Sequence, residues 1–378
     1  MERVAIHPRQ GWQDIVSTQG LTFHSPGGRP YWDESAFYRF KSWQIDELER
    51  ATNELHEMCL KAAQYVIDRK RFAEFGIPEA AVPSILEAWE AEPPAIYGRF
   101  DFSYDGRTPA KLLEYNADTP TALLEASVIQ WYWLQDIAPR EDQFNSIHER
   151  LVAKWKELRG YILARPLYFV HADDEEDLMT ATYMRDTADQ AGFETAGLLM
   201  KDIGWDSEQA SFVDLDGRPM RSIFKLYPWE WMLHEEFGPH ALEVAGEVQW
   251  IEPIWKMLLS NKAILAILWE LYPGHANLLE TYLDGPRALR QYVKKPKVSR
   301  EGANISMMSE EEAAQTDGDY GDEGYVYQAA APLPNFGGNR PVLGSWVIDG
   351  VSAGMGIRES AGPVTDNLSR FVPHLFVK

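Results

Sequence analysis

The sequence contains a single cysteine, Cys59, among its 378 residues. One thiol cannot form a disulfide within the chain, and it cannot build a zinc centre from several cysteines. Cys59 lies among apolar residues at helical spacing, which predicts a small buried side chain in an α-helix.

Basic residues are scarce. The chain has 36 Lys and Arg against 58 Asp and Glu, a formal net charge of −22. This balance argues against a nucleic-acid partner, because binding to phosphates needs a basic surface. The excess of acidic residues would suit a cationic substrate such as a polyamine. An acidic surface also keeps a protein soluble, and this alone can explain the excess.

Long apolar runs are missing as well. No segment approaches the roughly 20 apolar residues that span a bilayer, and the first residues lack the apolar core of a signal peptide. We therefore expect a soluble, cytoplasmic protein with no membrane partner. Nucleophile-elbow and His-Glu-x-x-His motifs are also absent, and the histidines show no metal-binding spacing.

The length and composition predict a globular chain of two or three interleaved subdomains with mixed α/β (α+β) structure. Their approximate ranges are 1–165, 166–260 and 261–378. The predicted helices are 42–75, 78–91, 121–135, 141–159, one ending at Ala191, and 261–271. The predicted strands are 167–171, 195–200, 223–227, 248–251, 325–331, 342–348 and 350–358. The strand–helix–strand order over 167–200 favours parallel pairing.

The most informative segment runs from Arg99 to Asn116 and reads as a β-hairpin. Two alternating runs, 96–104 and 111–116, flank a turn that contains Asp105-Gly106. Residues two apart share a face of a strand. A symmetric hairpin therefore places Asp101 opposite Glu114 and Arg99 opposite Asn116.

Two carboxylates and an amide oxygen on one face resemble the ligand set of a hard cation such as Mg²⁺. A solvent-exposed face with salt bridges is the alternative, since that is the commoner meaning of charges on a strand. The opposite face is strongly apolar, with Phe100, Phe102, Leu113 and Tyr115. This asymmetry favours a site.

Two lysines lie in otherwise apolar surroundings. Lys262 opens the run Lys-Ala-Ile-Leu-Ala-Ile-Leu-Trp, and Lys295 ends a strand-like segment. Each could contact nucleotide phosphates as a point charge. Each could equally be a surface lysine whose stem covers apolar groups.

Three further segments are candidates. The loop around Gly302, within a predicted lid 298–320, could cover phosphates. Glu175 and Glu176 follow a strand and could hold an ammonium group, or they could complement the N-terminus of the next helix. Arg358 could stabilise a transferring phosphoryl group or pair with Glu359.

Taken in order, these residues closely resemble the synthetase domain of the glutathionylspermidine synthase family, which includes the trypanothione synthetases and has an ATP-grasp fold. The resemblance extends from roughly residue 30 to the end of the chain. It is carried by Arg99-x-Asp101, Glu114-Tyr-Asn116-Ala-Asp, Asp174-Glu-Glu176, Lys225 with Trp229-Glu230, Ile251-Glu-Pro, Asn261-Lys-Ala-Ile-Leu, Lys295-Pro and Arg358.

The resemblance implies an ATP- and Mg²⁺-dependent ligase that activates a carboxylate as an acyl phosphate and joins it to an amine. It assigns Asp101, Glu114 and Asn116 to the metal. Arg99 and Arg358 would stabilise the phosphoryl group in transfer. The implied nucleotide contacts are Arg99, Lys262, Lys295, Gly302, Gln328, Ala329, Ala330 and Ala331, and the implied substrate contacts are Thr119, Thr121, Glu175 and Glu176.

The sequence departs from the family pattern at its substrate sites. Thr119 and Thr121 replace two serines but keep the hydroxyl group. Leu226 replaces a threonine associated with glutathione, Arg370 replaces an acidic residue at the polyamine site, and Val342 replaces a glutamine at the nucleotide site. We expect no amidase activity, because the sequence begins at the synthetase.

Two other functions remain open from the residues alone. The chain could be a nucleotide- or polyamine-binding protein that has lost turnover. Paired carboxylates and 14 tryptophans also leave a glycoside hydrolase open, since cross-strand carboxyl groups can reach the spacing that this reaction needs. Neither the lysines nor Asn116 has a role in the latter reaction.

Overall fold

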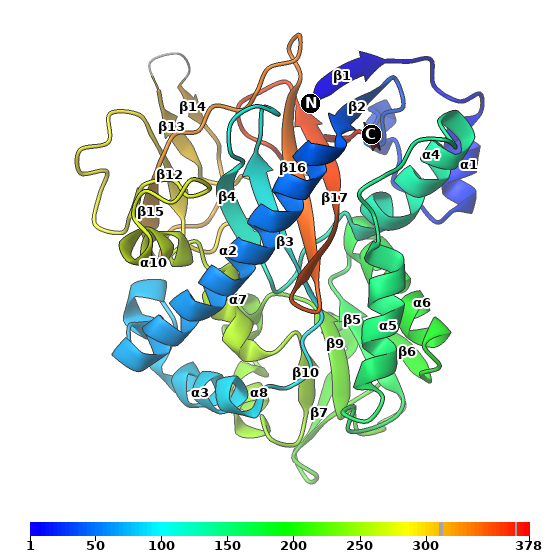
Figure 1. Ribbon diagram of the computed structural model, residues 1–378. Helices are drawn as coiled ribbons and strands as arrows, with labels where there is room; N and C mark the ends of the chain where they lie inside the picture. Colours follow the sequence, from blue (N-terminus) through cyan, green and yellow to red (C-terminus); the bar gives the residue numbers. More distant parts are fainter. Residues whose placement is uncertain (310–312, 367–368) are drawn as a thin grey trace.

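The computed structural model describes residues 1–309, 313–366 and 369–378 (Figure 1). Within these ranges the strands form two five-stranded sheets, a four-stranded sheet, a three-stranded sheet and a two-stranded ribbon. The helices are α1 (Trp12–Thr18), α2 (Ser42–Arg69), α3 (Val82–Ala91), α4 (Gln130–Ile137), α5 (Ile147–Leu158), α6 (Glu175–Gln190), α7 (Trp229–Met232), α8 (Gly238–Glu243), α9 (Met257–Ser260) and α10 (Ile264–Leu271).

The central sheet is antiparallel and joins segments that lie far apart in the chain. Its order is β18 (Arg370–Phe371), β17 (Val351–Ser360), β16 (Arg340–Ile348), β3 (Tyr97–Ser103) and β4 (Lys111–Asn116). The long helix α2 crosses one face of it (Figure 1). Phe100 and Phe102 point into the core on this side, where Thr52 of α2 also hydrogen-bonds Ser345 at 2.7 Å.

The β3–β4 hairpin has the predicted register. Arg99 lies opposite Asn116 and Asp101 lies opposite Glu114, with a bulge after Asp101. The ring of Phe100 stacks on Tyr115 at 3.8 Å between centroids, so the apolar face is locked against the core. Because side chains alternate along a strand, Arg99 and Asp101 point to the opposite side.

The second large unit is a parallel sheet with the order β10 (Gln249–Ile251), β9 (Ser222–Leu226), β5 (Leu167–His171) and β6 (Thr195–Leu199). Every residue of β5 is buried, as expected for a continuous apolar run covered on both faces. Helix α6 packs on β5 and α5 packs on α6 (Figure 1). The parallel pairing predicted over 167–200 is confirmed.

Smaller sheets complete the fold. One has the order β11 (Thr281–Tyr282), β15 (Tyr325–Ala329), β12 (Tyr292–Pro296), β13 (Ser306–Met308) and β14 (Ala314–Gln315). Another consists of β1 (Glu2–Ala5), β2 (Ala36–Lys41) and β19 (His374–Val377), and the ribbon is β7 (Gly204–Asp206) with β8 (Ser211–Val213). The C-terminal strand β19 pairs in parallel with β2, so residues near both termini lie together.

Several predicted boundaries are displaced for local reasons. Helix α2 ends at Arg69 instead of Phe75, because Lys70 adopts a left-handed conformation with φ of 54°. Helix α10 begins at Ile264 instead of Asn261, whose side-chain oxygen accepts the N–H of Ala263 at 2.9 Å. The predicted helix 141–159 begins at Ile147, because the preceding residues extend along β19 and β17.

The predicted lid 298–320 is only partly a loop. It contains β13 and β14, which pair with each other in antiparallel fashion. Its residues 310–312, part of the acidic stretch 309–323, lie outside the described residues.

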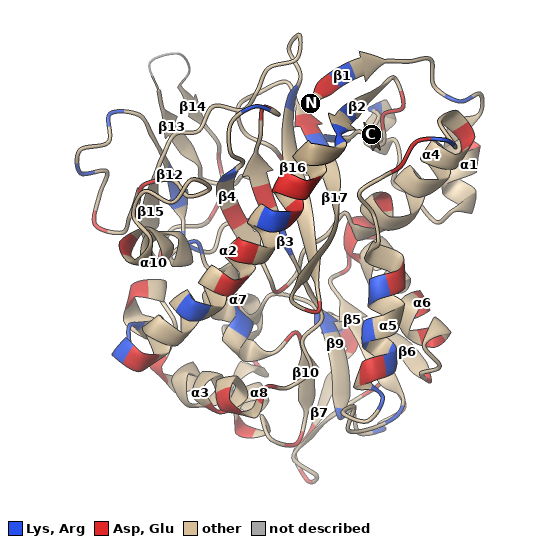
Figure 2. Cartoon of the chain, in the orientation of Figure 1, with Lys and Arg blue, Asp and Glu red and all other residues tan. Residues whose placement is uncertain are grey.

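Acidic and basic residues both lie along α2 and α5, in a mixed order (Figure 2). Each helix within the three described ranges is too short or too polar to cross a lipid bilayer.

Candidate active site

A polar cavity of about 300 Å³ opens on the face of the hairpin turned away from α2. Four segments form its walls: the end of β4 with the loop behind it, the start of α6, the connection from β9 to α7, and the loop 298–302. Arg99, Glu114, Asn116, Lys262 and Arg358 all line it. Three of the predicted phosphate-binding side chains and two of the predicted metal ligands therefore share one cavity.

Asp101 lies between two arginines at the floor of this region. Its Oδ1 accepts a hydrogen bond from Arg99 Nε at 2.7 Å, and its Oδ2 accepts one from Arg358 Nη2 at 2.6 Å. Arg99 also donates to the carbonyl oxygen of Thr121 at 2.7 Å. Arg358 is thus paired with Asp101 and not with Glu359, which was the alternative suggested by its sequence neighbour.

Close packing requires a glycine beside Arg99. Gly344 of β16 pairs with Asp101, and a β-carbon there would lie 2.8 Å from Arg99 Cδ. Because Gly344 has no side chain, the side chain of Arg99 can lie directly over its backbone.

Glu114 faces two lysines. Lys262 Nζ lies 3.1 Å from Glu114 Oε2 and donates to the carbonyl oxygen of Ser299 at 2.6 Å. Burial opposes ionisation of Glu114, but the positive charges of Lys262 and Lys295 outweigh it and lower the pKa. These charges favour the ionised form of Glu114, whereas the general acid of glycoside hydrolysis must be protonated.

Lys295 is buried at the end of β12. Its ammonium group donates to Gln328 Oε1 at 2.8 Å and to the carbonyl oxygen of Leu113 at 3.1 Å. Burial lowers its pKa to about 8. Neither lysine is the exposed, stem-packing residue that was the alternative interpretation, since the exposed fraction of each is 7%.

A second, mainly apolar cavity adjoins the first and shares Glu114, Gly302 and Thr365 with it. Asp101, Lys295, Gln328, Ala329 and Ala331 line this slot, together with Val293, Ile305, Met307, Leu333, Val342 and Val364. Ala330 is not among its lining residues and instead donates its N–H to Gln291. A narrow apolar slot beside a cationic cavity fits a planar base joined to phosphates.

Gly302 stands where the two cavities meet. Its φ is 71°, and a β-carbon would come within 2.5 Å of the carbonyl oxygen of Thr365. Only glycine fits this close approach without displacing the backbone.

The loop after β4 is held by Asn116. Its side-chain oxygen accepts the N–H groups of Asp118 at 3.3 Å and Thr119 at 3.0 Å, and its amide donates back to the Thr119 carbonyl. Thr119 and Thr121 both line the polar cavity.

The acidic residues at the start of α6 divide between two cavities. Glu176 lines the polar cavity with Asp174 and Asp177, whereas Glu175 lines a separate cavity between α6 and β6. Asp174 also caps the helix, because its side chain accepts the N–H of Glu176 at 2.8 Å. Burial and the neighbouring carboxylates Glu176 and Asp174 raise the pKa of Asp177 to about 7.

Arg300 is a cavity residue to which the sequence analysis gave no role. It donates to Thr119 Oγ1 at 2.5 Å and to Glu230 Oε1 at 2.9 Å, and so bridges the walls of the cavity. The one feature of the sequence that could have pointed to Arg300 is its position two residues before Gly302. The partners themselves, 181 and 70 residues away in sequence, could not be inferred.

The three departures from the family pattern that change the character of the side chain, Leu226, Val342 and Arg370, have different settings. Leu226 lines the polar cavity and Val342 lines the apolar slot. Arg370 lies apart from both and pairs with Asp33 at 3.0 Å and Glu359 at 2.9 Å.

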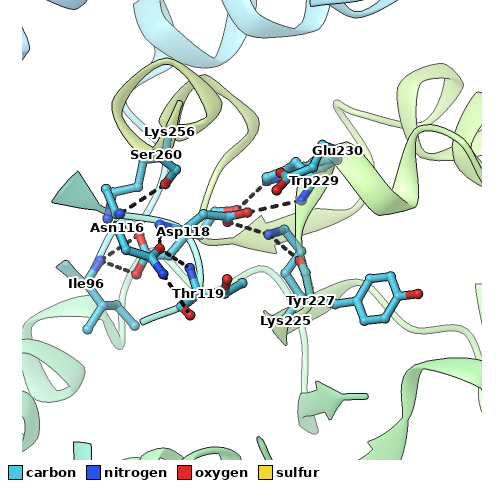
Figure 3. A network of polar contacts seen from close by, with 12 residues as sticks. Ile96, Asn116, Asp118, Thr119, Lys225, Tyr227, Trp229, Glu230, Lys256 and Ser260 are labelled. Atoms are coloured by element: carbon cyan, nitrogen blue, oxygen red, sulfur yellow. Dashed lines mark hydrogen bonds and ion pairs between the residues drawn. The ribbon is translucent and has the colours of Figure 1, made fainter. Parts of the chain in front are cut away.

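A buried polar network lies behind the part of the cavity lined by Thr119 and Glu230 (Figure 3). Asp118 pairs with Lys225 at 2.5 Å and also accepts the N–H of Trp229 at 3.1 Å. Beneath it, Glu252 accepts the N–H groups of Ile96 and Tyr97 at 2.9 and 3.1 Å. Glu252 also forms an ion pair with Lys256, which holds the start of β3 in place.

Glu125 is a buried carboxyl group behind the cavity and provides a test of the electrostatics. The Tyr31 hydroxyl donates to it at 2.7 Å. Burial, followed by the charge of Glu176, raises its pKa from 4.5 to about 7. The folded chain therefore binds more protons than the unfolded chain between these pH values, so stability falls as pH rises through this window.

We expect Glu125→Gln, which still accepts the Tyr31 hydrogen bond, to be more stable than the wild type at pH 8. The gain is about 3 kcal/mol, at about 1.4 kcal/mol for each pKa unit, and it shrinks toward pH 5. Urea unfolding at several pH values measures it. A gain that does not change with pH would contradict this account.

The chemistry of the hairpin fits a hard divalent cation. Asp101 and Glu114 offer carboxylate oxygens and Asn116 an amide oxygen, on adjacent strands. In the described part of the chain, no three His, Cys, Asp or Glu residues gather as a complete metal site. A cation here would draw its remaining ligands from substrate phosphates and water, as Mg²⁺ commonly does.

Comparison with known proteins gives consistent matches. The sequence pattern described as "Glutathionylspermidine synthase preATP-grasp" matches residues 3–377. A Haemophilus influenzae protein named "Putative acid--amine ligase" is 42% identical over 367 residues, which cover 93% of each chain. The Escherichia coli bifunctional glutathionylspermidine synthetase/amidase is 30% identical over 92% of this chain and 60% of its own length. Trypanothione synthetase of Crithidia fasciculata is 29% identical over 82% of this chain and 52% of its own length.

A solved structure supports the fold. The glutathione synthetase-like effector of Globodera pallida superposes with a TM-score of 0.56 at 10% identity, covering 97% of this chain and 95% of the effector. The predicted mixed α/β fold of the ATP-grasp type is confirmed.

Proposed function

The chain belongs to the glutathionylspermidine synthase family, whose members are ATP-dependent ligases, and from this membership we propose that it joins a carboxylate to an amine. In the proposed reaction the carboxylate takes the γ-phosphoryl group of ATP, which gives an acyl phosphate and ADP. The amine then attacks the acyl carbon, and an amide, inorganic phosphate and a proton result. The observation that carries the proposal is the meeting of Arg99, Arg358, Lys262 and Glu114 around one cavity, with Asp101 held between the two arginines.

The apolar slot is the proposed site of the adenine base. Its lining by Val342, Gln328, Ala329 and Ala331 supports this, as does the presence of Lys295 in the same slot. Lys295 and Lys262 are proposed to bind the phosphates as point charges, and Gly302 to let the loop backbone approach them closely.

Asp101, Glu114 and Asn116 are the proposed holders of Mg²⁺, which when bound neutralises phosphate charge. Arg99 and Arg358 both donate hydrogen bonds to Asp101 in this structure. With nucleotide bound, each would also donate to the phosphoryl oxygens. Such chemistry needs mainly positioning and charge neutralisation. Arg358 on β17 and Arg99 on β3 are well suited to it, because both are anchored on strands of one sheet.

The carboxylate substrate is proposed to lie against Thr119 and Thr121, whose hydroxyl groups can donate to it. The amine is proposed to lie against Glu176, beside Asp174 and Asp177. Glu175 faces the neighbouring cavity and would reach only a substrate that extends there. A peptide or glutathione-like acid and a polyamine-like amine are the proposed substrate classes.

An ATP-consumption screen tests the function. Purified protein, ATP and Mg²⁺ are combined with a panel of small peptide acids, each with and without polyamines, and phosphate release is followed. We expect release that requires one acid and one amine together, with an amide product of matching mass. Nucleotide binding without release for any pair would instead indicate a binding protein that has lost turnover.

A further inference from the structure

Asp118 and Lys225 form one of the most deeply buried ion pairs in the described part of the chain. Their side chains have exposed fractions of 1% and 0%, and Lys225 Nζ lies 2.5 Å from Asp118 Oδ1. Asp118 belongs to the loop after β4, and Lys225 belongs to β9. The pair thus joins the hairpin of the central sheet to the parallel sheet.

Neighbouring hydrogen bonds extend this junction into α7. Asp118 Oδ2 accepts the N–H of Trp229 at 3.1 Å, and Lys225 donates to the Tyr227 carbonyl at 2.9 Å (Figure 3). The Lys225 ammonium group also lies 4.9 Å from the centroid of the Trp229 ring. Trp229 in turn donates its indole N–H to the carbonyl oxygen of Glu252 at 2.9 Å. The first residue of α7 is therefore fixed at three points.

The residues on either side of this junction face the polar cavity. Thr119 follows Asp118 directly, whereas Glu230 and Trp231 follow Trp229, and all three line the cavity. Arg300 spans them, because it donates to both Thr119 and Glu230. The distance between these two walls is set by the buried pair beneath them.

Stability alone is a weak reason for such a pair. The cost of removing two charges from water often cancels their attraction, and uncharged residues of similar size can be equally stable. Burial lowers the pKa of Lys225, which reflects this cost. What an ion pair adds is a defined distance between its two partners. Here those partners lie directly beside the two walls of the cavity.

We propose that Asp118 and Lys225 are positioning residues that hold the Thr119 wall and the Glu230–Trp231 wall at the separation at which the acid and the amine meet. The pair touches neither cavity, so it acts through Thr119, Glu230 and Trp231. This inference rests on the proposed ligase function. Nucleotide binding, which is assigned to Lys262 and Lys295 on other elements, is independent of it.

The test compares Asp118→Asn, Lys225→Met and the double variant with Glu34→Gln. Glu34 forms another buried ion pair, with Arg9 at 2.5 Å, away from the cavity, so its variant controls for lost stability. Each protein is assayed for kcat, for KM of the acid and the amine, for affinity for a non-hydrolysable ATP analogue with Mg²⁺, and for melting temperature.

We expect both single variants to lose about 100-fold in kcat/KM, as small displacements of substrate groups do, with unchanged affinity for the analogue. The double variant, which leaves no unpaired charge, should regain its melting temperature but not its kcat/KM. Glu34→Gln should melt earlier and keep kcat/KM. Recovery of activity together with stability in the double variant would overturn the proposal.

Amide hydrogen exchange separates this proposal from the ligase assignment. If no acid and amine pair supports turnover in the wild type, the proposed function fails, but the positioning role is still measurable. We expect faster exchange at 117–121 and 226–232 in Asp118→Asn than in Glu34→Gln. Equal exchange in these segments would overturn the positioning role.

Discussion

Replacement of Arg358 by alanine is expected to lower the rate of amine-dependent ATP consumption by about 10³-fold or more. Arg358 Nη2 lies 2.6 Å from Asp101, and the side chain lines the cavity beside Arg99. In the proposed role its charge would neutralise a phosphoryl group in transfer, where each fixed donor contributes strongly because water is excluded. The affinity for the ATP analogue should change much less than the rate, which separates transfer from binding.

Arg370→Ala is the matched control for this variant. Arg370 lies on the neighbouring strand β18 and pairs with Glu359, the residue after Arg358, but it lines neither cavity. Glu359 keeps hydrogen bonds from Arg3 and Tyr38 when Arg370 is removed. We therefore expect near-normal turnover. If Arg358→Ala retained a rate similar to that of the control, the role assigned to Arg358 would be wrong.

Replacement of Glu252 by alanine is expected to cause the largest loss of stability, about 3–5 kcal/mol. Glu252 is fully buried and ion-paired with Lys256. Its removal leaves the Lys256 ammonium group without its counter-charge and the N–H groups of Ile96 and Tyr97 without an acceptor. Unsatisfied buried donors retain their full desolvation cost. The free energy of unfolding in urea measures the effect.

Two further variants separate charge from hydrogen bonding at this position. Glu252→Gln keeps an acceptor for the backbone N–H groups and should lose less stability than Glu252→Ala. Adding Lys256→Met to Glu252→Ala removes the unpaired charge and should recover part of the loss. Equal losses in all three proteins would mean that packing, and not the ion pair, accounts for the effect.

The hairpin shows how far local patterns determine a site. Alternation on both strands and a short turn fix its register, so the pairing of Asp101 with Glu114 followed from the sequence alone. The buried parallel strand 167–171 was equally well defined, because its residues are continuously apolar. Both features depend on neighbours in the chain.

Features that depend on distant partners could not be predicted in this way. The contact of Arg300 with Thr119 and the pair of Asp118 with Lys225 each join segments more than 100 residues apart. The division of Glu175 from Glu176 depends on where α6 begins, since successive residues of a helix point about 100° apart. The helix starts at Glu175 itself.

The order of strands in the central sheet has a consequence for how the protein folds during its synthesis. Asp101 and its partner Arg358 are 257 residues apart, and β3 pairs with β16, which is synthesised long after the hairpin. Synthesis proceeds from the N-terminus at about 5–20 residues per second. One edge of the hairpin therefore stays unpaired for many seconds after β3 and β4 have been synthesised. Asp101 meets Arg358 only after β16 and β17 have also been synthesised.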